Sequence, residues 1–237
     1  ANFNHAEARR AFQKAQRVDP NCALCFLGEA LILGPNINVP MDPEANAPAL
    51  AALRKAQSLA GGASEKEKAL IEAVSARYSD DPVAERPKLD MAFAEAMAAL
   101  SDKYPDDLEA RAFLALQLWK NRDSGSPITS FLAIDALLEQ VFRAEPMHPA
   151  HHYRIHLWDI ERADNALASA ALCGQSSPGI AHMWHMPGHI YSKTRRYDDA
   201  CYQQEASARV DHAHMMRDRV LPDQIHNFAH NNEWLIR

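Results

Sequence analysis

Residues 181–200 read AHMWHMPGHIYSKTRRYDDA, and this stretch decides the fold class. Apolar and aromatic side chains recur in it every three to four residues, which is the period of an amphipathic α-helix. The period predicts one helix over 180–195 and a second over 197–214, joined by a short turn. Two helices joined in this way form an α-hairpin, so the stretch predicts an all-α fold built from hairpins.

The same period continues toward both ends of the chain, and no segment shows the sustained alternation of a β-strand. One further helix ends at Asp19–Pro20, and others are predicted over 20–33, 44–60, 64–79, 86–103, 107–120, 130–145, 149–158, 160–173 and 222–237. The stretch KNRDSGSPIT (120–129) is the best internal linker. We therefore expect a stacked α-hairpin solenoid with N-terminal repeats over 1–120, a linker loop over 121–129 and His-rich repeats over 130–237 of the same solenoid.

Two segments resemble tetratricopeptide (TPR) repeats, which are helix pairs of 34 residues. The second helix of a TPR repeat carries a small, an aromatic, a small and a proline residue at a fixed spacing. This spacing is matched by Ala8, Phe12, Ala15 and Pro20. The first helix and turn of a repeat are matched by Trp184, Gly188, Tyr191, Tyr197 and Ala200. The middle repeats are degenerate, with Phe93 and Ile134 in place of the small residue. Both termini fall within repeat units, which predicts a fragment of a longer array or self-association through the incomplete terminal repeats.

Composition narrows the function classes. The chain has 237 residues and a formal net charge of −6, and no run of Lys and Arg exceeds two residues. This excludes the basic footprint of a nucleic-acid-binding protein. No apolar run reaches the roughly 20 residues of a membrane-spanning helix.

The cysteines carry a weaker signal. Cys22 and Cys25 form a CxxC motif, but Phe26 follows, so the haem-attachment signature CxxCH is absent. Four cysteines, with Cys173 and Cys201 standing alone, do not predict a disulfide framework. For the CxxC pair we favour a packing role of small residues over metal binding.

Histidine is concentrated in one part of the chain. Of 12 histidines, only His5 lies within 1–147. Three predicted helices each carry a pair four residues apart, a spacing that points both imidazoles the same way. The candidate metal ligands are these pairs together with His182, which shares a helix face with the second pair: His152, His156, His182, His185, His189, His226 and His230. If the three helices lie side by side, the imidazoles converge on one patch, and nitrogen ligands favour copper or zinc.

Other side chains could support such a centre. Asp159 and Glu233 extend two of the histidine faces by one turn, which suits acceptance of an outer imidazole N–H. Tyr153 and Tyr191 are candidate proton donors, although both also suit a hydrophobic core. The off-pattern histidines are His148, His151, His212 and His214, of which the first two are weaker ligand candidates. Trp158, Trp184 and Trp234 could form an aromatic wall beside the histidines.

Three segments resemble the signature segments of a family of bacterial TPR proteins, namely HPAHHYRIH (148–156), AHMWHMPGHIYSKTRRY (181–197) and IHNFAHN (225–231). The loop GPNINVPM (34–41) is similar to a further segment of that family. The sequence departs from the family at Ala150, Arg154 and Gly188, where the family has Gly, Tyr and Ser, and Asp159 stands near a family Glu. The resemblance implies a TPR-like α-superhelix with His-rich inner helices, without a specified reaction.

Pro187 allows two interpretations. Inside a helix it would remove a hydrogen bond and bend the helix, turning His189 relative to His185. Alternatively, the helix begins at Pro187 and 181–186 is a loop, which would weaken the shared face of the three histidines.

Two classes of function follow from the sequence. The first is a metalloprotein with a copper or zinc centre on the concave face of the solenoid, either a metal-dependent enzyme acting on a small molecule or a structural metal that staples the repeats. The alternative is a scaffold that binds a partner peptide in the groove without catalysis. Concentration of the histidines after residue 147 favours the local metal site.

Overall fold

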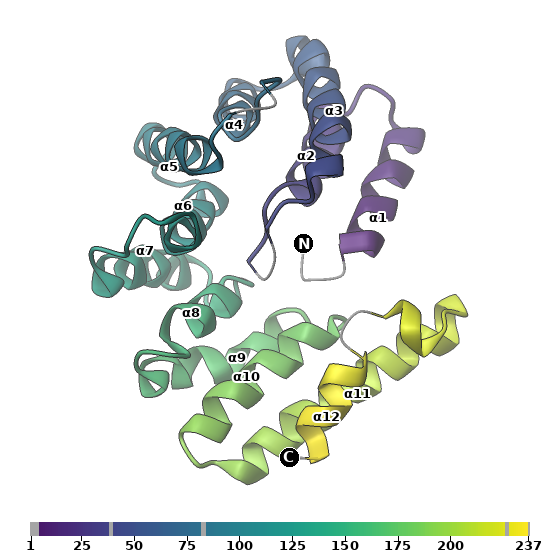
Figure 1. The fold of residues 1–237 in the computed structure, drawn as a ribbon, viewed down its shortest axis with the longest axis vertical. Coiled ribbons are helices and arrows are strands. Elements are labelled where there is room, and N and C mark those ends of the chain that lie inside the picture. The colour runs from purple at the N-terminus through teal and green to yellow at the C-terminus, as the bar shows by residue number, and fades with distance from the viewer. Residues whose placement is uncertain (1–4, 38–39, 82–83, 226–227, 237) are drawn as a thin grey trace. The chain divides into compact units, whose positions relative to one another are not determined.

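The computed structural model describes residues 5–37, 40–81, 84–225 and 228–236, and within them the fold is all-α without strands (Figure 1). The chain divides into two compact units, of which unit 1 spans His5–Ser130 and unit 2 begins at Phe131. Unit 1 contains α1 (His5–Val18), α2 (Ala23–Leu33), α3 (Asn46–Leu59), α4 (Glu65–Ser75), α5 (Arg86–Lys103) and α6 (Leu108–Lys120). Unit 2 contains α7 (Phe131–Ala144), α8 (His151–Trp158), α9 (Leu167–Ser176), α10 (Ala181–Lys193), α11 (Tyr197–Asp218) and α12 (Phe228–Ile236).

Each helix of unit 1 packs against the next one in the chain. The side chains that fill this unit are large and apolar, including Leu27, Ile71, Phe93 and Met97, each at most 2% exposed. Phe93, which the sequence places at an expected small-residue position, is therefore part of this core. Each helix of the unit buries one face against its neighbours. Apolar residues therefore recur at the helical period along the whole unit.

One buried carboxylate links helices α1 and α2 through hydrogen bonds. Glu29 of α2 accepts hydrogen bonds from the Gln13 and Gln16 amides at 2.8 Å each and from Arg9 Nε at 3.1 Å. Burial by itself raises the pKa of Glu29, but the hydrogen bonds from these three side chains of α1 outweigh it. The pKa therefore lies below its ordinary value of 4.5.

We expect Glu29→Ala to destabilise unit 1 by about 1.5–3 kcal/mol at pH 7, the usual contribution of hydrogen bonds to a charged group. Because the pKa is lowered in the folded state, the carboxylate stabilises the fold fully above pH 4.5 and loses this effect as the pH falls through its folded pKa. Urea unfolding followed by circular dichroism at several pH values checks both points. The exposed Glu72→Ala is the control, and an equal loss for both variants would contradict the expectation.

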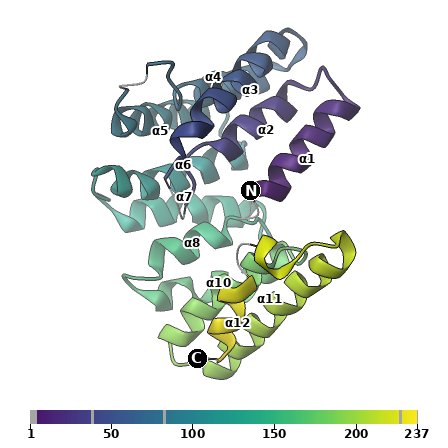
Figure 2. The ribbon, with the colours of Figure 1, turned by 45° about the vertical axis from the view of Figure 1, so that its right-hand side comes forward.

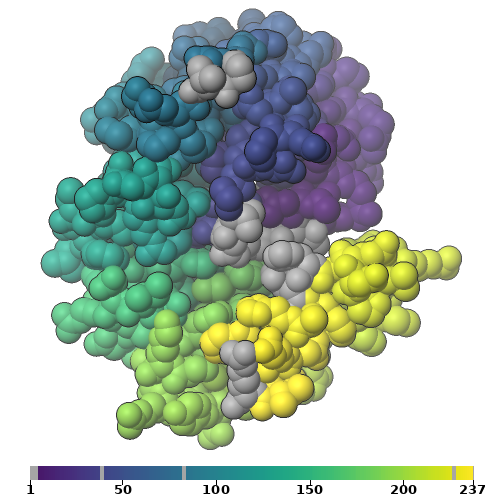
Figure 3. Space-filling model, in the orientation of Figure 1, coloured from purple at the N-terminus to yellow at the C-terminus, as the bar shows by residue number. Residues whose placement is uncertain are grey.

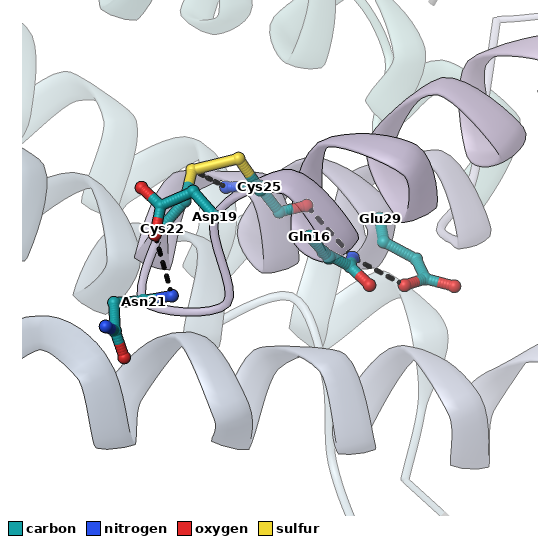
Figure 4. Close-up of a disulfide and its surroundings, with 6 residues drawn as sticks. All are labelled: Gln16, Asp19, Asn21, Cys22, Cys25 and Glu29. Atoms are coloured by element: carbon teal, nitrogen blue, oxygen red, sulfur yellow. Dashed lines mark hydrogen bonds between the residues drawn. A yellow bond between two sulfur atoms is a disulfide. The ribbon is translucent and has the colours of Figure 1, made fainter.

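Cys22 and Cys25 form a disulfide at the start of α2 (Figure 4). The packing role expected for the pair is therefore wrong. The backbone N–H of Cys25 also donates to Cys22 Sγ at 3.1 Å, so Cys22 caps the helix. The two Cα atoms are 5.4 Å apart because the helix begins between them, which brings both side chains to the same turn.

The predicted linker begins as an ordered turn of unit 1. Residues Asn121–Ser124 form a 3₁₀-helix that directly follows α6. Asn121 Oδ1 accepts a hydrogen bond from Gln117 at 2.6 Å, and Ser124 Oγ donates to Asp90 of α5 at 2.5 Å. The boundary between the two units falls later, after Ser130.

In unit 2 each helix packs against its sequential neighbour, and α8 also contacts α10 (Figure 2). The hairpins are thus α8–α9 and α10–α11, followed by α12. The yellow residues of the C-terminal segment lie at the surface of this unit in Figure 3. The helix predicted over 160–173 starts later than expected, because a 3₁₀-helix (Ala163–Ala166) precedes α9.

Helix α10 is continuous from Ala181 to Lys193 with Pro187 inside it. The alternative in which the helix begins at Pro187 is therefore wrong, and 181–186 is helical rather than a loop. Proline has no N–H to donate to the carbonyl one turn earlier, so α10 lacks one of its internal hydrogen bonds at this point. Within the described residues, every helix is too short or too polar to cross a membrane.

Candidate metal centre

Six of the seven predicted ligands lie in two groups of three. The first triad consists of His152 and His156 from α8 and His182 from α10, and the second of His185 and His189 from α10 and His230 from α12. Within each triad, one ring nitrogen per residue lies within 4.8 Å of the others. The seventh predicted ligand, His226, is outside the described residues.

In the first triad the two histidines of α8 face each other. Their Nε2 atoms are 3.0 Å apart, so one imidazole N–H points at the other ring nitrogen. The ring of His182 stands edge-on to His152 with centroids 5.0 Å apart. His182 therefore faces the preceding pair, and its expected grouping with His185 and His189 is corrected by the structure.

The second triad repeats this arrangement one turn further along α10. The Nε2 atoms of His185 and His189 are 2.8 Å apart. The ring of His230 lies 4.7 Å from that of His185, centroid to centroid. The third ligand thus comes from α12, the helix that follows the α10–α11 hairpin, just as His182 comes from α10, which follows the α8–α9 hairpin.

The nitrogen spacing is close to what a metal ion requires. Two nitrogens bound tetrahedrally to zinc at 2.0–2.1 Å lie about 3.3 Å apart. The observed separations of 3.0 and 2.8 Å therefore need to open by only a few tenths of an ångström to admit an ion.

Burial keeps four of these six imidazoles neutral. It lowers the pKa of His185 to about 3 and that of His189 to about 4. Burial likewise holds the pKa of His152 and His182 well below the ordinary value of 6.5. Neutral imidazole is the form that ligates metals, so at pH 7 protons do not compete for these nitrogens.

A buried glutamine orients His185. Gln204 of α11, 1% exposed, donates from its Nε2 to the backbone carbonyl of His185 at 3.1 Å. Its Oε1 therefore faces His185 Nδ1, 2.7 Å away, and accepts the Nδ1–H hydrogen bond. The proton on Nδ1 leaves Nε2 unprotonated for the second triad, which is the usual function of such a partner in metal sites.

Sequence reasoning missed Gln204, although a signal exists. Ala200, Gln204, Ser207 and Asp211 follow the helical period on one face of α11, and all four are buried. A polar stripe on the buried face of a helix indicates specific hydrogen-bond partners, because unpaired polar groups are costly there. Here Ser207 Oγ donates to the carbonyl of Ala181 at 2.8 Å, and Gln204 binds His185.

Gly188 makes room for this glutamine. A Cβ atom at position 188 would overlap the side-chain amide of Gln204. We expect Gly188→Ala to displace the amide from His185 and to weaken metal binding at the second triad. Stability should also fall, because the loss of the two buried hydrogen bonds of Gln204 outweighs the gain of up to about 1 kcal/mol from alanine as the better helix former. Chelator competition and thermal unfolding measure the two effects separately. Gly179→Ala, where nothing lies near the added carbon, is the control; equal metal affinity in both variants would contradict the expectation.

One of the three tryptophans of the expected aromatic wall lies at the site. The Trp234 ring is 4.1 Å from that of His189 and 5.8 Å from that of His185, centroid to centroid. Trp158 instead donates its Nε1–H to Asp135 at 2.8 Å, and Trp184 donates to the Pro178 carbonyl at 3.0 Å. Those two tryptophans stabilise helix packing.

The α8 helix is held in place from the side of α7. Arg154 donates to both carboxylate oxygens of Asp135 at 2.7 and 2.9 Å and pairs with Glu139 at 2.6 Å. The side chain of Trp158 binds the same Asp135. A bidentate arginine–carboxylate pair has a fixed geometry, so it sets the orientation of the helix that carries His152 and His156.

The predicted supporting residues have other described contacts. Asp159 pairs with Lys193, whose Nζ lies 2.9 Å from Oδ1, so its described partner is a lysine in place of the expected imidazole. Tyr191 is buried beneath the guanidinium of Arg196, 4.8 Å from the ring centroid. The Tyr153 ring lies 5.8 Å from that of His152, and Glu233 is exposed on α12.

The off-pattern histidines have structural contacts. Both ring nitrogens of His151 are engaged, Nδ1 with Ser169 Oγ at 3.0 Å and Nε2 with the Pro146 carbonyl at 2.8 Å. Its ring also stacks on Phe142. The ligand role considered for His151 is therefore wrong. His148 Nδ1 accepts the backbone N–H of Ala150 at 3.1 Å, and His214 Nδ1 lies 2.7 Å from Asp218 Oδ2.

The two histidine triads are thus assembled from three helices of one unit. Helices α8, α10 and α12 supply the imidazoles, and α11 supplies the glutamine that orients one of them. No model of a known protein family matches this chain, and no curated protein matches it.

Proposed function

We propose that unit 2 is a transition-metal centre carried on a TPR-like helical-repeat scaffold, with copper or zinc bound by the two histidine triads. The observation that carries this proposal is the pair of triads, each with three ring nitrogens within 4.8 Å of one another. His226 remains a candidate seventh ligand.

The chemistry of the donors supports metal binding over simple packing. A buried histidine that only stabilises a core has hydrogen-bond partners on other side chains or the backbone, as His151 does. In the triads, by contrast, imidazole nitrogens face each other at 3.0 and 2.8 Å. Neutral nitrogen ligands favour copper and zinc, and three protein ligands leave a coordination position for water or a small molecule.

Local packing supports the TPR-like scaffold. Trp184 of α10 lies where a Cβ atom on Gly174 of α9 would be, and Phe12 of α1 lies in the same way against Gly28 of α2. In both places an aromatic ring fills the space left by a glycine on the adjacent helix. Close approach of this kind is what the small and aromatic positions of a TPR repeat provide. The resemblance of the histidine segments to bacterial TPR proteins agrees with this scaffold.

The test is elemental analysis of the purified, tag-free protein, before and after dialysis against copper or zinc. We expect near-stoichiometric metal in the unaltered protein and a loss of the second triad's share in His185→Ala/His189→Ala. The matched control is His212→Ala/His214→Ala, which removes the same number of histidines from α11 without touching a triad. Its metal content should equal that of the unaltered protein.

Protein that takes up neither metal after dialysis would overturn the proposal. The same conclusion follows if both double variants lose metal equally, because binding would then not depend on the triads. In either case the peptide-binding scaffold becomes the better hypothesis, and its histidines would be contacts for a partner.

A further inference from the structure

We propose that the two triads form one dinuclear site, in which a small bridging anion such as hydroxide or azide joins two metal ions. This inference rests on the proposed function, because it requires that the triads bind metal. Beyond metal binding, it specifies how many ions bind, how close they lie to each other and which chemical class of ligand joins them.

The first argument is that the triads adjoin each other. His182 and His185 belong to different triads, yet they are three residues apart on α10 and their ring centroids are 5.6 Å apart. Three residues of α-helix rise about 4.5 Å. That displacement is close to the separation of about 3.5–4 Å between the ions of two-metal sites. Two ions bound here would therefore be neighbours.

The second argument is charge. Every donor of both triads is an imidazole, and no carboxylate belongs to either group among the described residues. The nearby Asp159 is paired with Lys193, and Asp211, which accepts a hydrogen bond from Asn231 at 2.7 Å, belongs to neither triad. Two divalent ions would thus bring about four positive charges to two triads that contain no carboxylate ligand. Uncompensated buried charge is costly, so an anion from solution should bind with the ions.

The third argument is the size and position of that anion. Three protein ligands leave each ion an open coordination position, and adjacent ions can share one donor atom or one short ligand there. His152, His182 and His185 are at most 5% exposed, and the Trp234 ring covers His189. This burial favours an anion of a few atoms over an organic polyanion.

The experiment uses the full chain loaded with Cu(II) and titrated with sodium azide. We expect about two copper ions per chain, one for each triad. Bridged Cu(II) ions couple magnetically, so the electron paramagnetic resonance signal should account for far fewer spins than copper ions. Azide should produce a ligand-to-metal charge-transfer band that saturates at about one azide for each pair of ions.

The variant His156→Ala removes a half-buried ligand of the first triad only, and His182→Gln provides a second variant in case the first fails to fold. Either should reduce copper to about one ion per chain and restore one full spin per copper. The variant His212→Ala/His214→Ala should behave as the unaltered protein. Circular dichroism verifies that each variant is folded.

Two outcomes would overturn the inference and leave the proposed function standing. One is two copper ions that each give a full spin and bind azide separately, which would indicate two independent centres. The other is a single copper ion per chain in the unaltered protein. Absence of any copper uptake, together with absence of zinc uptake, would instead overturn the proposed function itself.

Discussion

Replacing Gln204 by alanine is expected to weaken metal binding at the second triad by about 10- to 100-fold, the usual cost of losing the partner that orients a metal-binding histidine. Without the Oε1 acceptor 2.7 Å from Nδ1, His185 can carry its proton on Nε2, the nitrogen that faces His189. Titration of the variant and the unaltered protein against a chelator of known affinity measures the change.

Two variants separate orientation from general disruption of α11. Gln203→Ala removes a neighbouring buried glutamine of the same helix and should leave affinity nearly unchanged. Gln204→Glu retains an acceptor for the Nδ1–H and should recover most of the affinity. If Gln203→Ala and Gln204→Ala weakened binding equally, the orienting role of Gln204 would be refuted.

Ile155→Ala is expected to destabilise unit 2 by about 2–5 kcal/mol, the range for loss of buried methyl groups together with the cavity that remains. Ile155 is 0% exposed and lies on α8 between the ligands His152 and His156. The measurement is urea unfolding of the metal-free protein by tryptophan fluorescence, since three of the four tryptophans belong to this unit.

Graded controls accompany this prediction. Ile155→Val removes one methyl group and should cost about 0.5–1.5 kcal/mol. Ile160→Ala, at a side chain 72% exposed, should change stability by no more than about 0.5 kcal/mol. A cost for Ile155→Ala as small as that for Ile160→Ala would show that α8 is not part of the stable core.

Much of the helix content and most of the candidate ligands were predictable from local patterns. Residues 181–193 show the helical period and a histidine pair four apart, and both features are properties of a single helix. The grouping of His182 with His152 and His156, instead of with its neighbours on α10, was not predictable in the same way. On α10 His182 is offset by only about 60° from His185, and which neighbouring helix each ring meets depends on how the helices pack.

Other features depend on contacts between segments far apart in sequence. Gln204 and His185 are separated by 19 residues, and nothing in either helix alone indicates their hydrogen bond. The late start of α9 has a local cause instead. Residues 163–166 (ADNA) form a tighter 3₁₀ turn, and four residues are too few for the sequence pattern to distinguish the two kinds of helix.

Helix α10 carries ligands of both triads, one for the first and two for the second. Because one helix carries all three ligands, a rotation or shift of α10 that moves one of them also moves the others. An ion held by the first triad would therefore restrain the ligands of the second triad before another ion binds. The conformational entropy of α10 would be lost on binding the first ion and not again on binding the second. Occupancy would then rise sigmoidally with metal concentration, and each ion would increase the affinity for the other by the same factor.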